Sequence, residues 1–456
     1  MDWIVAFLIV APAAYLYLVG SSWLIDYLVW VTVLNRGIRR YIDWVAGAFN
    51  AFSPISLTPL VISGFIFLLV LKTYPTYPTY LQKIFRLFGI ALALGFLVGL
   101  ALNQLAAVYA LAEYVAPLSI MGCAAMAKGN ERVLDRWVKS VGWAAVVVSV
   151  YGWYQYYTIP AWDAFWVRAV GFEGYLGHLR PTEMVVFSTM QERGPLAGFL
   201  SFAVIPMIIS SRWRNALGWV SVVIILSVIL LTFVRTAIIT IAVATVMFPI
   251  LNRGKNTVQL ILLLCVAAVG GNYILNKTGS TKVSKRLSTL SSISEDGSFK
   301  GRISIAGYGA TQLLKKPWGT GLGSTGLAGR VNSGGLEAGA AIGDNGYLEI
   351  LFSFGLIGGG MFFYAFYLIW RQVRIFEKLG IKSESLMMCK TLFVTGAVAL
   401  FAGNWFSGAG SVVFCVFAGF AAYPKFAMDR VSREFAEKKR RALEAAARPR
   451  LAGQFR

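Results

Sequence analysis

The stretch GDNGYLEILFSFGLIGGG (residues 343–360) decides how the chain is organised, because a polar region ends within it and an apolar region begins. Before it, residues 276–345 are rich in Gly and Ser and carry nine Lys and Arg against four Asp and Glu. After it, residues 346–427 are almost continuously apolar, as are residues 1–275. There is little structural reason to keep so long a cationic loop outside a bilayer. The loop therefore predicts a site for an anionic ligand.

The apolar segments predict helices that cross a membrane. Of the 456 residues, 57% are hydrophobic and only 14% are charged. Segments of about 17–25 apolar residues span the hydrocarbon core as helices, and irregular backbone facing lipid would leave its amides without partners. We therefore expect an all-α polytopic membrane protein with about 12–14 transmembrane helices. The expected helices lie near residues 3–19, 22–34, 56–73, 84–102, 105–126, 138–157, 195–211, 216–233, 236–251, 258–275, 346–370, 388–404 and 409–427.

Two further segments complete the expected organisation. Residues 41–72 lie between basic clusters and are expected to enter and leave the membrane as a hairpin or re-entrant pair, with a break near Pro54. Residues 1–427 would then form one integral membrane domain. Residues 428–456 would form a basic cytoplasmic tail, either a helix on the anionic inner leaflet or a solvated segment.

The formal net charge of +21 follows the expected helix ends, as in the cluster Arg36, Arg39 and Arg40. Such a distribution is the positive-inside pattern of a membrane protein, and it argues against a nucleic-acid partner. It predicts that both termini are cytoplasmic and that two longer loops, 158–194 and 276–345, lie outside. The other clusters are Lys72, Lys83 and Arg86; Lys128, Arg132, Arg136 and Lys139; Arg212 and Arg214; Arg253 and Lys255; and Arg371, Arg374, Lys378 and Lys382.

The residues that usually hold metals or form disulfides are sparse. All four cysteines fall inside apolar runs, and His178 is the single histidine. This pattern predicts neither a disulfide framework nor a metal cluster, and we expect no cofactor.

Arg235 is a charged residue in the apolar run LLTFVRTAIITIAV (residues 230–243). An arginine at the centre of a membrane helix costs about 2.5–3.5 kcal/mol and usually faces a cavity or a partner. The alternative is a turn between two spans, with Arg235 at the outer interface. Both interpretations are compatible with a cleft that binds a lipid-linked phosphate.

Further arginines lie in the two expected outer loops. Arg168, Arg180 and Arg193 belong to the first, and Arg286 and Arg302 to the second. Guanidinium groups suit phosphate oxygens because they stay charged and donate hydrogen bonds in parallel pairs. Each of these arginines could instead be solvated or paired with a nearby carboxylate. Their clustering favours an anion site.

The run GLGSTG (residues 321–326) fits the dinucleotide-binding pattern G-x-G-x-x-G, but no predicted strand precedes it. Without a βαβ unit this pattern does not indicate a dinucleotide site. Gly321 and Gly323 are instead expected to let the backbone approach a ligand or turn sharply.

The second half of the chain resembles the family of O-antigen ligases and Wzy-type polysaccharide polymerases. The resemblance rests on Arg302, on KKPWGTGLGSTG (315–326) and on GDNGYLEILFSFGLIG (343–358). FVRTA (233–237) is similar to a Ser-Arg-Thr-Ala junction of the family, and ERGPLAGFL (192–200) to its Arg-x-Gly helix opening. The resemblance covers roughly residues 160–370.

This resemblance implies a metal-independent glycosyltransferase of the GT-C type. Its donor would be a glycan on undecaprenyl pyrophosphate. Arg235 and Arg302 would bind the pyrophosphate, with Arg193 nearby. Arg180, Arg168, Arg286, Gly321, Gly323 and Asn345 are further candidates for binding substrate.

Asp344 stands where the ligases of the family carry a histidine that engages the acceptor hydroxyl. A carboxylate in reach of that hydroxyl can act as a general base. The alternative is that Asp344 is a helix N-cap, a position that Asp fills well. Glu192 and Glu337 are weaker candidates for the base.

The sequence thus predicts a polymerase of a bacterial surface or secreted polysaccharide. It would join undecaprenyl-pyrophosphate-linked glycans at the outer face of the inner membrane, with a chain-length regulator protein as a conceivable partner. One alternative is a ligase that transfers the lipid-linked glycan to a lipid A-core acceptor. A transporter of an anion or of a lipid-linked sugar is an alternative of another class, but such proteins usually show internal repeats or paired broken helices.

Overall fold

The computed structural model describes residues 1–50, 53–252, 309–325, 345–381 and 383–423, together with Gly307, Glu437 and Arg440. Every named element in this part of the chain is a helix, which confirms the all-α prediction. The first half contains α1 (Asp2–Leu18), α2 (Trp23–Ala46), η1 (Pro54–Leu57), α3 (Thr58–Thr73), η2 (Tyr74–Thr76), α4 (Thr79–Asn103), α5 (Leu105–Met126), α6 (Glu131–Thr158), α7 (Ala161–Ala169) and α8 (Glu173–Leu176). The second half contains α9 (Arg193–Ile209), η3 (Ser211–Trp213), α10 (Trp219–Leu231), α11 (Arg235–Asn252), α17 (Gly346–Lys378), α18 (Glu384–Ala399), η5 (Leu400–Ala402) and α19 (Ser411–Ala422).

The helices have the length and composition of a polytopic membrane protein. Six helical segments of the described chain are long and apolar enough to cross a membrane: Pro54–Thr76, Thr79–Asn103, Leu105–Met126, Arg235–Asn252, Gly346–Lys378 and Glu384–Ala402. Four shorter apolar helices, α1, α9, α10 and α19, accompany them. The expected total of 12–14 spans stays a prediction, since the span near 258–275 lies outside the described residues.

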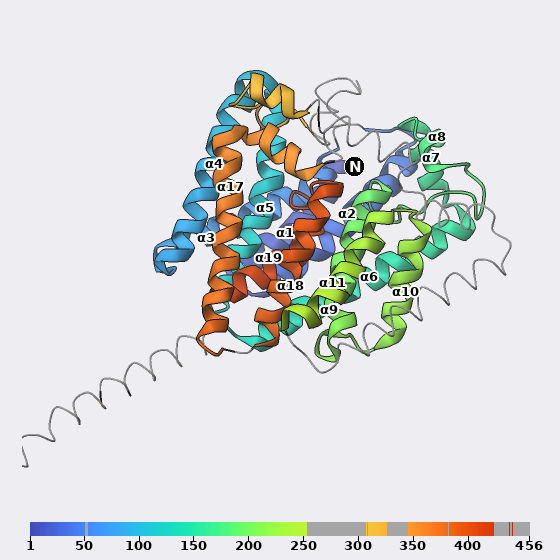
Figure 1. Cartoon of the computed structure of the whole chain (residues 1–456). Coiled ribbons are helices and arrows are strands. Elements are labelled where there is room, and N and C mark those ends of the chain that lie inside the picture. The colour runs from blue at the N-terminus through green and yellow to red at the C-terminus, as the bar shows by residue number, and fades with distance from the viewer. Residues whose placement is uncertain are drawn as a thin grey trace, which may run out of the picture.

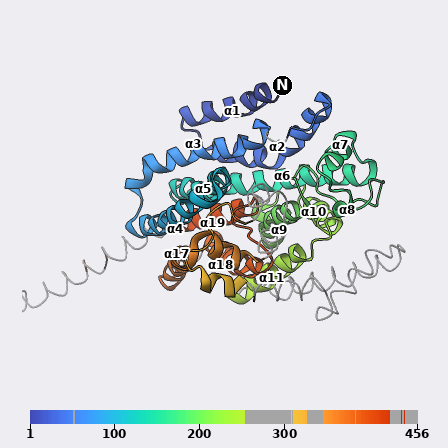
Figure 2. The same ribbon diagram turned by 90° about the horizontal axis from the view of Figure 1, so that it is seen from above.

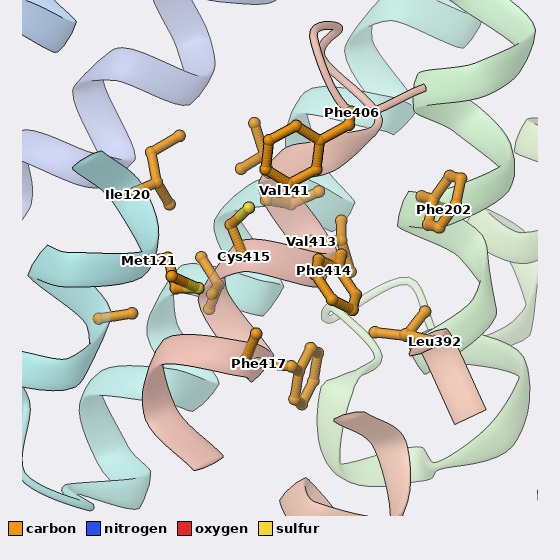
Figure 3. Packing of buried hydrophobic residues seen from close by; sticks show 14 of the residues in the cluster. Ile120, Met121, Val141, Phe202, Leu392, Phe406, Val413, Phe414, Cys415 and Phe417 are labelled. Atoms are coloured by element: carbon orange, nitrogen blue, oxygen red, sulfur yellow. The ribbon is translucent and has the colours of Figure 1, made fainter. Parts of the chain in front are cut away.

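The helix α19 forms the centre of the bundle. All twelve of its residues are buried, and Figure 3 shows Phe414, Cys415 and Phe417 pointing from it toward neighbouring helices. It packs closely on α5, where Gly419 permits an approach to Met121 and Ala124 that a larger residue would obstruct. Seen from above (Figure 2), α1 lies at the edge of the molecule.

The helix α2 corrects the prediction for residues 22–72. It runs unbroken from Trp23 to Ala46, so the first arm of the expected hairpin is the end of this helix. The chain then turns and enters α3 through η1. The arginines Arg36, Arg39 and Arg40 therefore lie within a helix and do not mark its end. The pattern of apolar residues is interrupted at these arginines, whose side chains bind other parts of the protein.

Arg40 joins α2 to the segment that connects α6 to α9. Its Nε lies 2.8 Å from Oδ1 of Asp163 in α7, and its Nη1 donates to the carbonyl of Met190 at 2.6 Å. Both side chains of the ion pair are fully buried, at 2% and 0% exposure. Burial raises the pKa of Asp163, and the guanidinium of Arg40 opposes that rise. The end of α2 thus lies with α7 and α8; we call this end of the bundle the α7 face.

The N-terminus also lies at the α7 face. The side-chain amide of Asn50 donates to Oδ2 of Asp2 at 2.9 Å, and α7, α8 and the N-terminus lie in the upper half of Figure 1. The helix α19 ends at the opposite face, where the ring of Phe417 packs on Trp213. The expectation that both termini are cytoplasmic stays a prediction, because most of residues 424–456 lie outside the described part of the chain.

The segment 309–325 departs from the expected outer loop. It is helical over 309–315, and its glycine-rich part then packs between α4 and α17. The amide of Leu322 donates to the carbonyl of Gly95 at 2.9 Å, and the amide of Thr320 donates to Phe352 at 2.8 Å. Gly321, Leu322 and Gly323 are buried.

The same segment stabilises a break in α17. Gly355 has φ 71° and ψ 178°, which is not helical. The amide of Leu356 donates to the carbonyl of Pro317 at 2.7 Å, so an amide near the break is bonded outside its own helix. Backbone groups buried from water need such partners. A Cβ on Gly355 would lie 2.6 Å from the carbonyl carbon of Trp318, so no larger residue fits.

We predict that residues on the α7 face are accessible from one side of the membrane and that residues on the opposite face are accessible from the other side. Cysteines introduced one at a time at Ala48 and Glu183 should react with a membrane-impermeant thiol reagent added to the same side of the membrane. Those at Arg132 and Lys378 should react only when the reagent is added to the other side. All four positions are exposed. Reaction of Ala48→Cys together with Arg132→Cys would contradict the crossing of α2.

Gly321→Ala should destabilise the protein strongly. Gly321 has φ +78°, and a Cβ there would overlap the backbone of Gly99. The positive φ costs about 1–2 kcal/mol, and the overlap adds about 1–3 kcal/mol. A lower melting temperature in detergent would report this loss. The matched control is Gly360→Ala, which is exposed in α17 with open space around it; equal melting temperatures for the two variants would contradict the packing.

Candidate functional site

The predicted motif around Asp344 leads directly into α17. Asn345 is the N-cap of this helix, and its Oδ1 accepts from the amides of Tyr347 and Leu348 at 3.0 and 3.2 Å. The capping position considered for Asp344 is therefore filled by its neighbour. The side-chain oxygen of Asn345 thus has a structural role, and its predicted role in binding substrate stays a prediction. Asp344 itself lies outside the described residues.

One turn into α17, Glu349 belongs to a buried polar cluster. Its Oε1 accepts from Nδ2 of Asn404 at 3.1 Å, and the same amide group donates to the hydroxyl of Tyr114 at 2.6 Å. Glu349 is 8% exposed and Tyr114 is 3% exposed. Asn404 follows η5 and so brings the end of α18 to the start of α17. The carboxyl group of Glu349 is thus held by the amide of Asn404 one turn inside the start of α17.

A second acidic side chain, Glu113 of α5, lies near Glu349. Tyr109 interacts with Glu113, and the guanidinium of Arg36 donates to the hydroxyl of Tyr109 at 3.4 Å. Arg36 also hydrogen-bonds the side chain of Gln191. Among the described residues, Arg36 is a cation that lies near this acidic region. The cluster links α2, α5 and α17 near the α7 face.

Two predicted arginines each begin a helix at the α7 face. Arg193 is the first residue of α9, and its guanidinium stacks 4.5 Å from the ring centroid of Tyr175. Arg235 is the first residue of α11 and is half-buried. Of the two interpretations of Arg235, the structure supports the turn between spans. The amide of Val186 donates to the carbonyl of Leu231 at 3.3 Å, which joins this turn to the segment that precedes α9.

A cation at the first turn of a helix is placed against the helix dipole, whose N-terminal end is positive. Free amides at the same end add to the positive potential. The starts of α9 and α11 thus combine arginine side chains with helix N-termini. Such an arrangement favours an anion.

The other arginines of the first loop have a different environment. Arg168 pairs with Glu173 at 3.5 Å, with both side chains more than half exposed. The side chain of Arg180 is exposed, as is His178. A surface pair of this kind contributes little to stability. Neither arginine is brought into the buried cluster.

Gly321 and Gly323 lie where a loop packs closely against two helices. Their close neighbours are the backbones of Gly99 and Ala106, so they allow helices α4 and α5 to approach the loop. Of the expected alternatives, the sharp turn is the one observed, since both residues have positive φ. Their predicted role in binding substrate stays a prediction.

Four predicted residues lie outside the described part of the chain: Arg286, Arg302, Glu337 and Asp344. Glu192, the other candidate base, is half-buried at the N-cap of α9. Among the described residues, no group of three or more His, Cys, Asp or Glu side chains is arranged to hold a metal ion.

The sequence interpretation missed Glu113, Glu349 and Asn404. Glu113 stands in the apolar run ALAEYVAPL (110–118), and Glu349 stands within the quoted motif itself. A charged residue inside a membrane span marks a functional site by default, so both could have been found. Asn404 could not, because its contact to Glu349 joins residues that are 55 positions apart.

The model of the family described as O-antigen ligase matches residues 220–363. The match confirms the resemblance over this stretch, and the chain carries a domain of that family there. The stretch contains α10, α11 and the first half of α17, with Arg235 and Glu349 among its residues. A search of curated proteins found no match. The family supports an enzyme of the ligase or polymerase type acting on glycans.

Proposed function

We propose that the protein polymerises a bacterial surface or secreted polysaccharide from glycans carried on undecaprenyl pyrophosphate. The observation that carries the proposal is the convergence of three features at the α7 face. Arg193 and Arg235 begin helices there, and Asn345 begins a third helix directly after Asp344. The buried Glu349 lies one turn inside this third helix, with the half-buried Glu113 of α5 near it.

The reaction would be a glycosyl transfer of the GT-C type. An acceptor hydroxyl oxygen attacks the anomeric carbon of the donor, and the bond from that carbon to the pyrophosphate oxygen breaks. The products are a longer glycan and the free polyprenyl diphosphate, while the hydroxyl proton passes to a base. The transfer needs no nucleotide, because the activated donor bond supplies the free energy.

The arginines would act on the leaving group. Negative charge develops on the diphosphate as the bond breaks, and fixed cations and helix N-termini lower the energy of that state. Arg235 and Arg193 are proposed for this role, with Arg302 as the third. A bound anion would offset the electrostatic repulsion between each of these two arginines and the positive end of its helix dipole.

Asp344 is proposed as the general base, because the cap of α17, the other role considered for it, is supplied by Asn345. Glu349 would position the acceptor through its bonded neighbours Asn404 and Tyr114. The side chain of Asp replaces the histidine of the ligases at this position, which favours polymerase over ligase. The ligase remains the second candidate because the matching family is described by that activity.

We further propose that the α7 face is the outer face of the bacterial inner membrane. The opposite face carries Arg132, Arg136, Lys139, Arg371 and Lys378 at helix ends, and basic residues favour the cytoplasmic side. In this orientation the N-terminus is extracytoplasmic. The donor and any chain-length regulator protein would meet the enzyme on the α7 face.

Arg235→Ala should reduce polymer synthesis by about 10²–10³-fold, the loss typical for removal of one donor that stabilises a developing anion. Arg235→Lys should restore part of the activity, because a point charge replaces a bidentate group. Polymer is measured per amount of protein in the membrane. The control Arg168→Ala removes an exposed, paired arginine and should leave polymer unchanged; an equal loss in the two variants would contradict the role of Arg235.

Asp344→Asn should lower the rate by about 10²–10⁴-fold, since an amide cannot accept the hydroxyl proton. Glu349→Gln should have a smaller effect, because its carbonyl oxygen can still accept from Asn404. The two rates are compared with purified protein of equal melting temperature. A severe loss in Glu349→Gln with near-normal activity in Asp344→Asn would move the base to Glu349.

Deletion of the gene distinguishes polymerase from ligase. A polymerase mutant should accumulate single repeat units on the polyprenyl lipid, detected by mass spectrometry of extracted lipids. Complementation with the wild-type chain should remove them. Accumulation of intact polymer on the lipid would instead show that the protein transfers finished chains.

A further inference from the structure

At the face opposite α7, a groove of about 540 Å³ opens between α2 and α6. Its residues follow helical spacing. Arg132, Arg136, Lys139 and Trp143 lie at intervals of four, three and four along α6, and therefore share one side of that helix. Trp23, Asp26 and Trp30 line it from α2 in the same manner.

The groove changes from cationic to aromatic along its length. The helix α6 begins at Glu131, so Arg132 is nearest the helix end and Trp143 lies deeper. Eleven residues of helix separate the two, a rise of about 16 Å. Trp23 and Trp143 remain exposed, at 56% and 37%. Tryptophan favours the boundary between headgroups and hydrocarbon, so the groove spans that boundary.

The acidic residues of the groove are already engaged. Asp26 accepts from Nε of Arg136 at 3.1 Å, and Asp135 accepts from Nε of Arg212 at 2.7 Å. Within the described chain no ion pair is found for Arg132 or Lys139. The side chains of both are exposed. Two unpaired positive charges thus face the mouth of the groove.

We propose that this groove binds an anionic phospholipid, with its phosphate between Arg132 and Lys139 and an acyl chain along Trp30 and Trp143. Arg136 forms a fixed part of the lining of the site. Its guanidinium is held by Asp26 and by the carbonyl of Ser22 at 2.8 Å, and it lies over the ring of Trp23. Basic pockets between transmembrane helices recognise anionic headgroups in this way. The groove lies at the end of the bundle remote from the glycan site and is independent of the proposed function.

Native mass spectrometry of the full-length protein in detergent tests the proposal, with added phosphatidylglycerol as the probe and phosphatidylethanolamine as the zwitterionic comparison. The wild-type protein should retain phosphatidylglycerol in preference. Each basic residue near an anionic headgroup contributes about a fivefold gain in affinity, so Arg132→Ser with Lys139→Ser should weaken binding about 30-fold. The exchange Arg132→Lys with Lys139→Arg keeps both charges and should preserve binding.

The matched control is Arg371→Ser with Lys378→Ser, which removes two exposed charges from α17, outside the groove. It should leave phosphatidylglycerol binding within about twofold of the wild type. Unchanged binding in the Arg132 and Lys139 variant would overturn the proposal. So would an equal loss in the control, or equal retention of phosphatidylethanolamine by the wild-type protein.

Discussion

The close backbone contact between residues 317–325 and the helices α4 and α17 fixes where α17 bends and how its first half is held. Gly321 lies against Gly99, and Gly355 lies against Trp318, at distances that no side chain would allow. The carbonyl and amide groups freed at the break are bonded to the inserted segment, as a membrane interior requires. The first half of α17 follows its N-cap Asn345 and carries Glu349, so the position of the polar cluster depends on these glycines.

Much of the fold could be predicted because apolar length decides it. The expected spans in the described chain each coincide with a helix, and α5 matches at both ends. The error at α2 has a definite cause. Arg36, Arg39 and Arg40 interrupt the apolar pattern as a loop would, but they bind Gln191, Asn50 and Asp163 within the protein. Local sequence cannot distinguish a solvated arginine from one whose partner lies more than a hundred residues away.

The sequence predicts those parts of the candidate site that are marked by a pattern within a short stretch of the chain. Arg235 and the motif near Asp344 stand out in sequence because polar residues adjoin apolar helices. The structure adds helix packing at Gly321 and Gly323 and helix capping at Asn345, which the sequence did not predict for these residues. The cluster of Glu113, Glu349 and Asn404 depends on contacts between distant helices. Spacing along the chain does not encode such contacts.

The two ends of the bundle use cations differently. At the α7 face, Arg193 and Arg235 begin helices and Arg40 forms a buried ion pair, whereas the opposite face carries exposed Lys and Arg beside tryptophans. Polymerisation at the α7 face is the central claim. Purified protein in phosphatidylglycerol vesicles, given a synthetic polyprenyl-pyrophosphate repeat unit, tests it most directly. The predicted result is a ladder of longer lipid-linked glycans with release of one polyprenyl diphosphate for each bond formed. Unextended repeat units, from protein shown to be folded, would contradict it.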